Sequence, residues 1–347
     1  MGRADARRGS AKIDSGSGAS RAVVQLVYGP PDVLELGTIP TPAPGQGEVL
    51  VRVRAASINA RDWHVMRGEP LLARLLDRSS FGLRRPRAAI RGTDLAGIVE
   101  AVGAEVTRWR VGDHVFGEGA AAFADHAVVP ADQVAPVPEG LGFDEAAALP
   151  LAATTAMLIL DAADPAPGDT VVVNGASGGV GTFVIQLAKA RGLHVTAVVS
   201  SRNVSLARSL GADRVIDYTV DDFTLEGAQH DVVVDLVGNR NLRELRRACR
   251  PGGALVLSGG GVPGTGRLIG PLRLLIWAQL YGAVRRVRVL VPQAVPDAEA
   301  LERVAELVAA QQVTAVIDRR FRLEDAADAI RYMEVHHASG KVVITTT

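Results

Sequence analysis

Cysteine is almost absent from this sequence, which has only Cys249 among its 347 residues. A single cysteine excludes an internal disulfide framework and any cysteine-rich zinc site built within one chain. We therefore expect a protein of the reducing cytoplasm. A net charge is also lacking, because 38 Lys and Arg balance 38 Asp and Glu. This balance favours neither nucleic acid nor an acidic membrane, so the expected partner is a small-molecule substrate.

Long apolar runs are missing as well. Residues 1–20 are small and polar and contain arginine, without the apolar run of a secretory signal, so we predict a flexible tail. The nearest approach to a membrane-spanning run, residues 268–280, is interrupted by Gly270, Pro271 and Arg273. Because a spanning helix needs about 20 consecutive apolar residues, we expect no stable membrane insertion.

The chain does have enough apolar sequence to fold, with 48% hydrophobic and 22% charged residues. Its length suits two domains better than one, because single hydrophobic cores stop growing at smaller sizes. From Ala22 to about Val137, short strand-like runs alternate with turn residues, which predicts a barrel-like β domain. Between them lies a basic insert, Leu71 to Arg87. Its leucine spacing indicates either one short amphipathic helix or a solvated surface excursion.

From residue 144 onwards the pattern changes. The apolar segment from Asp144 to Leu160 predicts one helix, after which strands alternate with helices. This alternation is typical of a doubly wound parallel sheet, so the fold class is α/β. The predicted strands are residues 170–174, 194–200, 214–218, 231–238 and 253–260. A helix at 297–311, a strand at 313–319, a helix at 324–335 and a strand at 341–346 are predicted to follow.

A glycine-rich turn follows the strand at 170–174. Gly175, Gly178 and Gly181 stand at three-residue spacing where the next helix begins. Glycine there lets the chain turn sharply and lets backbone N–H groups approach a pyrophosphate, which the helix N-terminus also attracts. Glycine is more usual at the position of Ala176, and a purely structural turn is the alternative. The predicted cofactor-binding residues of this turn are Gly175, Ala176, Ser177, Gly178, Gly179, Val180 and Gly181.

The end of the next predicted strand indicates which dinucleotide binds. Ser200, Ser201 and Arg202 stand about 20 residues past the glycines, where an NAD site would present an acidic residue to the ribose. Hydroxyls followed by a guanidinium suit the 2′-phosphate of NADPH, because arginine offers a bidentate fork to phosphate oxygens. We therefore expect NADPH as the cofactor. The alternative is that Arg202 only begins the next helix, exposed to solvent.

With these features in place, the chain resembles the medium-chain dehydrogenase/reductase superfamily, and within it the zinc-free quinone oxidoreductase-like branch. The matching blocks are residues 44–62, 91–103, 111–117, 174–181, 209–218 and 337–344. The resemblance implies a GroES-like β-barrel catalytic domain interrupted by a doubly wound Rossmann domain, with the nicotinamide in the cleft between them. The implied bounds are 21–145 and 292–347 for the catalytic domain and 146–291 for the NADPH-binding domain.

Zinc-dependent members of this superfamily carry a catalytic cysteine early in the first domain and a Gly-His-Glu where this chain reads Gly92, Thr93, Asp94. Both ligands are missing, as are the four close cysteines of a structural zinc lobe. We therefore expect no metal. Without zinc to polarise it, a simple alcohol is a disfavoured substrate. The resemblance instead favours hydride transfer to a quinone or to the C=C bond of an α,β-unsaturated carbonyl.

The resemblance also implies roles for single residues. Asn59 corresponds to an asparagine near the nicotinamide or the substrate, and Thr155 to a threonine that positions the nicotinamide. The residues implied to contact the cofactor are Tyr218, Val237, Ser258, Gly259, Gly260 and Lys341. The alternatives are structural: a helix brace for Thr155, a core position for Tyr218 and a surface charge for Lys341.

The sequence leaves several alternatives for the proton donor. Enoyl-thioester reductases of this superfamily place a tyrosine after the segment that here reads Met66 to Pro70, and no tyrosine stands nearby. His64 is the titratable candidate, with water or no dedicated residue as alternatives, and it is also open to interpretation as a packed or exposed histidine.

Two other functions stay open at this point. One is an enoyl reductase of a biosynthetic pathway, for example of polyketides, and the other is a non-catalytic NADPH-binding sensor or scaffold. Residues 270–289 combine leucines with arginines and either touch a membrane surface or form a lid or dimer helix over the cleft. We favour the second interpretation and therefore expect a homodimer.

Overall fold

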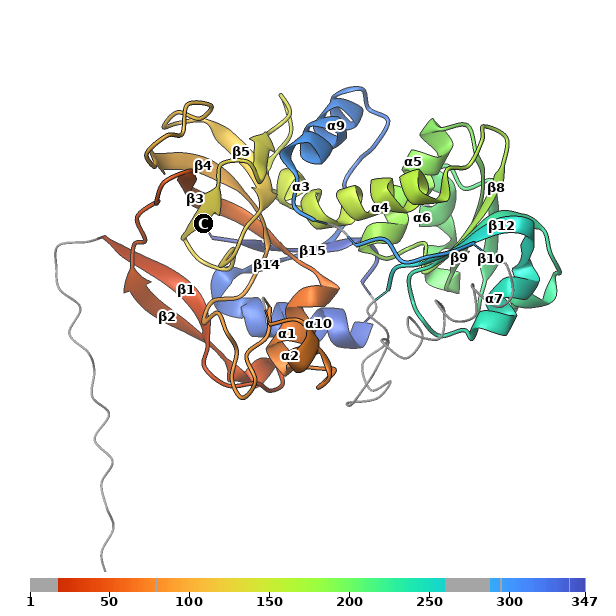
Figure 1. Cartoon of the computed structure of the whole chain (residues 1–347), viewed down its shortest axis with the longest axis horizontal. Coiled ribbons are helices and arrows are strands. Elements are labelled where there is room, and N and C mark those ends of the chain that lie inside the picture. Colours follow the sequence, from red (N-terminus) through yellow and green to blue (C-terminus); the bar gives the residue numbers. More distant parts are fainter. Residues whose placement is uncertain (1–17, 79, 260–287, 294, 337, 347) are drawn as a thin grey trace, which may run out of the picture.

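The computed structural model describes residues 18–346 except residues 79, 260–287, 294 and 337 (Figure 1). Gly260 and almost all of the 270–289 segment, for which we predicted a lid or dimer helix, lie outside the described residues. So do residues 1–17 of the predicted tail. The prediction that the tail extends to residue 20 is wrong at its end. Strand β1 begins at Ala19, and Ser20 is fully buried within it, with its hydroxyl 3.1 Å from the ring of His126.

Within the described residues, seven strands form one mixed sheet on the left of Figure 1. Strand β3 (Glu48–Ile58) is its centre, because it pairs with β4 along one edge and with β6 and β15 along the other. The other six strands are β4 (Asp94–Val102), β5 (His114–Glu118), β6 (His126–Pro130), β7 (Val134–Pro136), β14 (Ile317–Arg322) and β15 (Lys341–Thr345). The C-terminal strand β15 therefore lies directly beside the strand that leads to Asn59.

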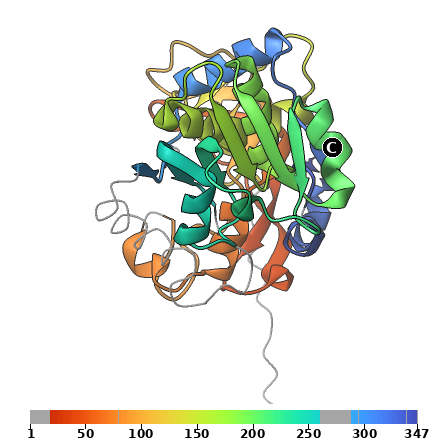
Figure 2. The same cartoon turned by 90° about the vertical axis from the view of Figure 1, so that its right-hand side faces the viewer.

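A second sheet of six parallel strands lies on the right of Figure 1 and faces the viewer in Figure 2. Its order is β10-β9-β8-β11-β12-β13. The bounds are β8 (Thr170–Asn174), β9 (His194–Val199), β10 (Arg214–Asp217), β11 (His230–Asp235), β12 (Cys249–Leu257) and β13 (Arg288–Leu290). The chain runs outward in one direction from β8 and in the other from β11. Ligands of such sheets bind at the carboxyl ends of the two strands where the order reverses.

Helices cover both faces of the parallel sheet. Val171 and Val173 of β8 pack with α4 and α5, whereas Val172 points to the other face and packs with α7. This alternation follows from the two-residue period of a strand. The helices around this sheet are α4 (Pro150–Ala163), α5 (Gly179–Ala190), α6 (Val204–Ser209) and α7 (Leu242–Ala248).

One apolar core continues from the first sheet to the second. It includes Ala96 and Phe116 of the mixed sheet together with residues of α3 (Phe143–Ala147), α4 and the parallel sheet. The predicted single helix from Asp144 to Leu160 is wrong, because α3 ends at Ala147 and α4 begins at Pro150. Proline lacks the N–H that a continuous helix needs at this position and is tolerated in the first turn of a helix, so a new helix begins there.

The described chain completes its fold with short elements at the edges. They are β1 (Ala19–Gln25), β2 (Leu34–Pro40), α1 (Ala60–Arg67), α2 (Ala73–Leu76), α9 (Ala298–Ala309), α10 (Ala326–His336), and the 3₁₀ turns η1 (Pro31–Val33), η2 (Ser201–Asn203), η3 (Phe223–Leu225) and η4 (Leu323–Asp325). The strand predicted at 313–319 is observed as β14 (Ile317–Arg322), which begins four residues later than predicted. No helix among the described residues has the length and hydropathy to span a membrane.

The glycine turn supplies a matched pair of test positions. A Cβ at residue 181 would lie 2.3 Å from the Gly175 carbonyl oxygen, whereas a Cβ at residue 178 would lie 3.5 Å from that oxygen. We expect Gly181→Ala to lower the free energy of unfolding by about 1–3 kcal/mol, because the helix must move away from the turn. Gly178→Ala is expected to change it by less than about 0.5 kcal/mol. Urea unfolding of both variants measures the difference, and equal losses would contradict this packing.

Candidate active site

The glycine turn lies at the carboxyl end of β8, at the point where the strand order reverses. Gly175 has φ +87°, a left-handed conformation that favours glycine, and the chain then enters α5 with Gly178 as its N-cap residue. A Cβ at Gly178 would meet only one atom within 4 Å, so the outer side of the turn has open space. This geometry fits a pyrophosphate against the N-terminus of α5.

An unpredicted polar network supports the turn from below. The buried Asp235 carboxylate, at the end of β11, accepts hydrogen bonds from the Asn174 amide at 2.9 Å and from the N–H groups of Val237 and Gly238 at 3.1 Å. The Asn174 amide also donates to Asn239. Burial raises the pKa of Asp235. The sequence signal for this network is an acidic residue that ends an otherwise apolar strand.

The predicted Val237, Ser258 and Gly259 gather on this network. A Cβ at Gly175 would approach the Val237 side chain to 2.7 Å, and the Ser258 N–H donates to the Asp235 carbonyl. A Cβ at Gly259 would lie 2.5 Å from the Leu236 carbonyl oxygen. The ends of β8, β11 and β12 are therefore packed together at one edge of the sheet.

The end of β9 presents the three polar residues expected to select the dinucleotide. Ser201 and Arg202 are exposed in η2, and the Ser201 hydroxyl lies 3.1 Å from that of Thr219. Tyr218, beside Thr219, is 52% exposed and is therefore not a core residue. The Arg202 guanidinium donates to the His336 carbonyl at 2.5 Å. Two hydroxyls therefore face each other at the end of β9, while the Arg202 guanidinium is directed to the end of α10.

Polar contacts also connect the glycine turn with the C-terminal segment. Asn203 donates to the Ser177 hydroxyl at 3.0 Å and accepts from the Ser339 hydroxyl at 2.7 Å. The Gly340 N–H donates to the Ser177 carbonyl at 2.8 Å. A Cβ at Gly179 would lie 3.0 Å from the Lys341 side chain. The residues just before β15 therefore touch the turn directly.

Lys341 extends from this contact into the interior of the mixed sheet. Its side chain is 3% exposed, and its ammonium group donates to the Asn59 amide oxygen and to the Asp94 carboxylate, the latter at 3.3 Å. The Ser57 hydroxyl donates to the same Asp94 oxygen at 3.1 Å. The prediction placed Lys341 near the cofactor. In the structure its aliphatic stem packs against Gly179, and its ammonium group bonds to Asn59.

Asn59 is itself held on three sides. As N-cap of α1, its N–H donates to the Asp62 carboxylate at 2.7 Å, and its amide nitrogen donates to the Thr93 hydroxyl at 3.3 Å. The amide oxygen accepts from Lys341. Because an ammonium group only donates, the Asn59 atom that faces it must be the oxygen. The amide nitrogen is therefore fixed on the side of Thr93.

The ionisable groups around Lys341 perturb one another. Burial, with a contribution from the negative charge of Asp94, raises the pKa of Glu118 to about 8. Glu118 is directly opposite Asp94 in the register of β4 and β5. Burial raises the pKa of Asp62 to about 6, against the opposing bond from the Asn59 N–H. At neutral pH Glu118 therefore keeps its proton.

Comparisons with known proteins agree with this geometry. The Alcohol dehydrogenase GroES-like domain model matches residues 45–139, and the Zinc-binding dehydrogenase model matches residues 210–344. A zinc-type alcohol dehydrogenase-like protein of Schizosaccharomyces pombe is 33% identical, covering 91% of this chain and 93% of that protein. The chain belongs to the medium-chain dehydrogenase/reductase superfamily.

Two further similarities indicate the branch of this superfamily. The NADPH-dependent alkenal/one oxidoreductase of Arabidopsis thaliana is 30% identical, covering 93% of this chain and 79% of that protein. The solved quinone oxidoreductase of Coxiella burnetii has a TM-score of 0.82 at 29% identity, covering 95% of this chain and 100% of that chain. This medium-chain dehydrogenase/reductase is therefore an oxidoreductase of the quinone oxidoreductase-like type, and such enzymes bind nicotinamide cofactors. The predicted α/β fold with GroES-like and Rossmann parts is confirmed.

The two remaining predicted catalytic residues are His64 in α1 and Thr155 in α4. His64 is five residues after Asn59, about 7.5 Å along the axis of α1, and its Nδ1 is 2.9 Å from the Glu69 carbonyl oxygen. Its ring stacks on Trp63. In α4 of this medium-chain reductase, the Thr154 hydroxyl bonds to the Pro150 carbonyl. The neighbouring Thr155 is partly exposed, so the helix brace is Thr154 rather than Thr155.

The raised pKa of Glu118 predicts a pH-dependent stability. The folded chain holds this proton up to about pH 8, whereas a free carboxyl releases it near 4.5, so the free energy of unfolding falls as pH rises between these values. Asp62 acts in the same direction only up to about pH 6. Glutamine cannot ionise. Between pH 6 and pH 8 the free energy of unfolding should therefore fall less for Glu118→Gln than for the unmodified chain. The expected difference between the two falls is about 1–3 kcal/mol.

Urea unfolding at several pH values measures this effect. Glu139→Gln, an exposed position just beyond the same sheet, is the matched control and should leave the pH dependence unchanged. Parallel pH profiles for Glu118→Gln and the unmodified chain would show that Glu118 is ionised in the folded state.

Proposed function

We propose that this protein is a zinc-independent, NADPH-dependent oxidoreductase that transfers a hydride to a quinone or to the C=C bond of an α,β-unsaturated carbonyl. The observation that carries the proposal is the buried group of Lys341, Asn59 and Asp94, which we call the Lys341 cluster. An ammonium group bound to Asn59 and Asp94 stands among the residues where zinc-dependent relatives hold their metal. A fixed positive charge at this place repels a metal cation and leaves Asn59 and Thr93 as the polar groups of the site.

Asn59 is the residue proposed to polarise the substrate. Lys341 fixes the amide oxygen, so the amide nitrogen presents two N–H groups on its other side. One donates to Thr93, and the second is the proposed donor to the carbonyl oxygen of the substrate. Negative charge develops on that oxygen when the β-carbon of an enone accepts a hydride. A donor that is already oriented stabilises this charge without reorganising during the reaction.

NADPH supplies the hydride when it is bound. The glycine turn would hold its pyrophosphate, and the proposed contacts of the 2′-phosphate are Ser200, Ser201 and Arg202. Tyr218 would lie beside the adenosine. The Arabidopsis relative whose name states NADPH dependence supports this choice. The proton for the substrate α-carbon is assigned to water, because His64 is turned towards the Glu69 carbonyl at the other end of α1.

The Arg202 proposal predicts a change in cofactor preference. A charged hydrogen bond contributes about 1.5–3 kcal/mol, so Arg202→Gln is expected to weaken NADPH binding about 10- to 100-fold. NADH binding should stay within about twofold, because NADH has no 2′-phosphate. Fluorescence titration with both nucleotides measures the ratio. Arg208→Gln, exposed in the following helix, is the control. If Arg202→Gln weakened the binding of NADPH and NADH equally, Arg202 would not contact the 2′-phosphate.

The Asn59 proposal predicts a loss of turnover without a loss of cofactor. Asn59→Asp has nearly the same shape and keeps an acceptor for Lys341, but it has no N–H to donate. We expect kcat to fall about 100- to 1000-fold with quinones and enones, while the Kd for NADPH is unchanged. Ser57→Ala is the control, since it removes a bond to Asp94 behind Lys341 and leaves the Asn59 amide in place. The assay follows NADPH oxidation against a panel of quinones and enones.

The same panel decides between this function and its alternatives. Turnover of at least one acceptor by the unmodified chain is the expected result. Tight NADPH binding without turnover of any acceptor would overturn the reductase and favour a sensor or scaffold. An Asn59→Asp variant as active as the unmodified chain would show that another group polarises the substrate.

A further inference from the structure

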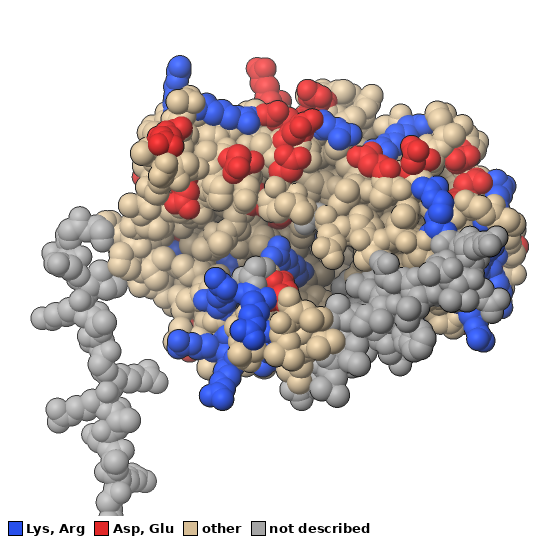
Figure 3. All heavy atoms as spheres, in the orientation of Figure 1, with Lys and Arg blue, Asp and Glu red and all other residues tan. Residues whose placement is uncertain are grey.

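The basic insert predicted from the sequence forms a distinct surface beside α1. Among the described residues of the insert, the exposed side chains are of two kinds, large aliphatic and cationic. They are Leu75, Leu76, Leu83, Arg78, Arg84, Arg85 and Arg87, which we call the arginine–leucine surface. In Figure 3 the basic side chains of this part of the molecule gather at the lower left of centre, over the region where Figure 1 places α1 and α2.

The backbone that carries this surface is firmly anchored. The Tyr28 hydroxyl donates to the Gly82 carbonyl at 2.8 Å and accepts from the Gly82 N–H at 3.0 Å. The guanidinium of Arg74 lies 4.0 Å from the centroid of the Tyr28 ring and donates to the Gly68 carbonyl. Phe81 and Pro86 are buried. The exposure of the leucines and arginines is therefore a property of an ordered turn rather than of a loose excursion.

The exposed leucines are unusual for a protein surface facing only water. Leu75, Leu76 and Leu83 are 58%, 68% and 50% exposed. Leu26 and Val27, at 70% and 58%, follow Gln25, whose N–H bonds to the Ala89 carbonyl just after the insert. Several exposed aliphatic side chains on one short segment favour an interaction site over singly scattered ones.

The charge of the insert is one-sided. Residues 71–87 contain five arginines and one acid, Asp77, in a chain whose acids and bases balance overall. Among the described residues, Arg84 and Arg85 make neither hydrogen bonds nor ion pairs. Arg87 donates to the Arg78 carbonyl. Four exposed guanidinium groups are therefore concentrated around the exposed leucines.

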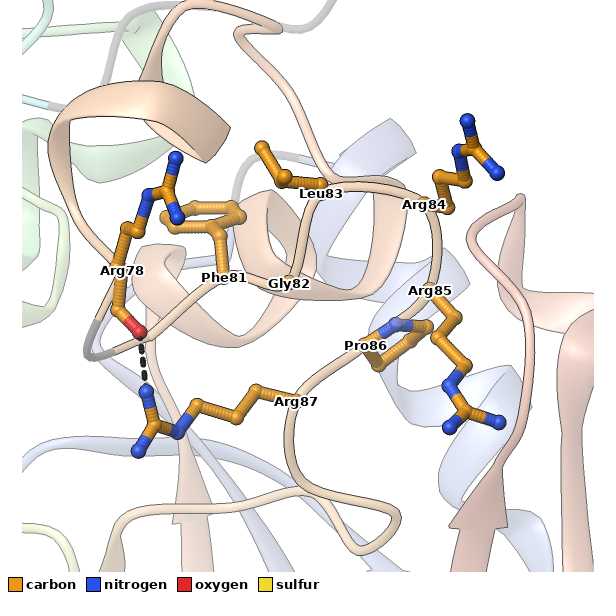
Figure 4. Close-up of a pocket in the computed structure, with 8 residues that line it drawn as sticks. All are labelled: Arg78, Phe81, Gly82, Leu83, Arg84, Arg85, Pro86 and Arg87. Carbon is orange, nitrogen blue, oxygen red and sulfur yellow. Dashed lines mark hydrogen bonds between the residues drawn. The ribbon is translucent and has the colours of Figure 1, made fainter.

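The directions of these groups favour an extended anionic surface over a single anion. Figure 4 shows the side chains of Arg84 and Arg85 pointing away from each other at the border of a depression of about 610 Å³ that they line together with Phe81. Guanidinium groups that diverge cannot meet on one phosphate. A bilayer with anionic headgroups satisfies both kinds of side chain, since headgroups pair with arginines while leucines enter the boundary of the acyl chains.

We propose that the arginine–leucine surface docks this enzyme reversibly on an anionic lipid bilayer. The surface adjoins the active site, because Asn59 caps α1 and Arg61 of that helix donates to Ser80 of the insert at 2.8 Å. The docked enzyme would take its acceptor from the lipid phase. This last step rests on the proposed function and assigns the acceptor to the lipophilic quinones or enones that partition into bilayers.

Vesicle sedimentation tests the docking without any use of turnover. The full-length protein should sediment with phosphatidylcholine vesicles that contain phosphatidylglycerol, and should stay in solution with phosphatidylcholine alone. High salt should release it, because screening weakens the arginine contacts. Each arginine near such a surface changes binding about fivefold, so a variant with Arg84→Gln, Arg85→Gln and Arg87→Gln should bind about 100-fold more weakly. Leu75→Ser combined with Leu76→Ser should also release the protein.

The matched control replaces Arg208 and Arg243, which are exposed on the parallel-sheet side, with glutamine. This control should bind vesicles as the unmodified chain does. The docking proposal is overturned if the unmodified chain does not sediment with anionic vesicles, or if the control and the insert variant lose binding equally. Association of the protein with itself through this surface, in place of vesicle binding, would overturn it as well.

A second measurement separates this proposal from the proposed function. With a water-soluble quinone, the insert variants should match the unmodified chain. With a lipophilic quinone held in anionic vesicles, they should be slower. Vesicle binding together with no turnover of either quinone would retain the docking surface and reject the reductase. Equal rates with the vesicle-held quinone would reject the acceptor assignment alone.

Discussion

The Lys341 ammonium group lies inside the mixed sheet, where an unpaired charge would be very costly, and its neighbours follow from that requirement. Asp94 supplies the countercharge and Asn59 the second acceptor. Glu118 keeps its proton because burial disfavours its charged form, with a further contribution from the negative charge of Asp94 opposite it. The same side chain orients the amide of Asn59 and packs against Gly179, so one residue connects the cofactor turn with the catalytic sheet.

The choice of lysine at this position is informative. Lysine occurs only three times among the 38 basic residues, at positions 12, 189 and 341. Arginine would bring a planar fork of five donors, whereas two acceptors face the compact ammonium group. Breaking this contact by removing the charge would leave Asp94 buried and unpaired. The stability of this part of the sheet and the proposed polarisation of the substrate therefore depend on one interaction.

The strand and helix pattern predicts the parallel sheet and the glycine turn because both depend on local sequence. Valine alternation along β8 and the glycine spacing before α5 are visible without the structure. The Lys341 cluster is not visible in this way, because strand β15 joins β3 across 282 residues of sequence between Lys341 and Asn59. The break between α3 and α4 is also visible in the sequence, because a proline stands at position 150. The network of Asp235 and the protonation of Glu118 depend on burial, which the order of residues alone does not give.

We propose that hydride transfer here needs the Asn59 amide, held by the Lys341 ammonium group, and no metal. This proposal is tested most directly by dialysing the purified protein against a chelator, measuring the bound metal, and assaying NADPH oxidation with a quinone or enone on the same sample. The account predicts full activity in metal-free protein and no increase when zinc is added. Activity that is lost with the metal and returns with zinc would contradict it.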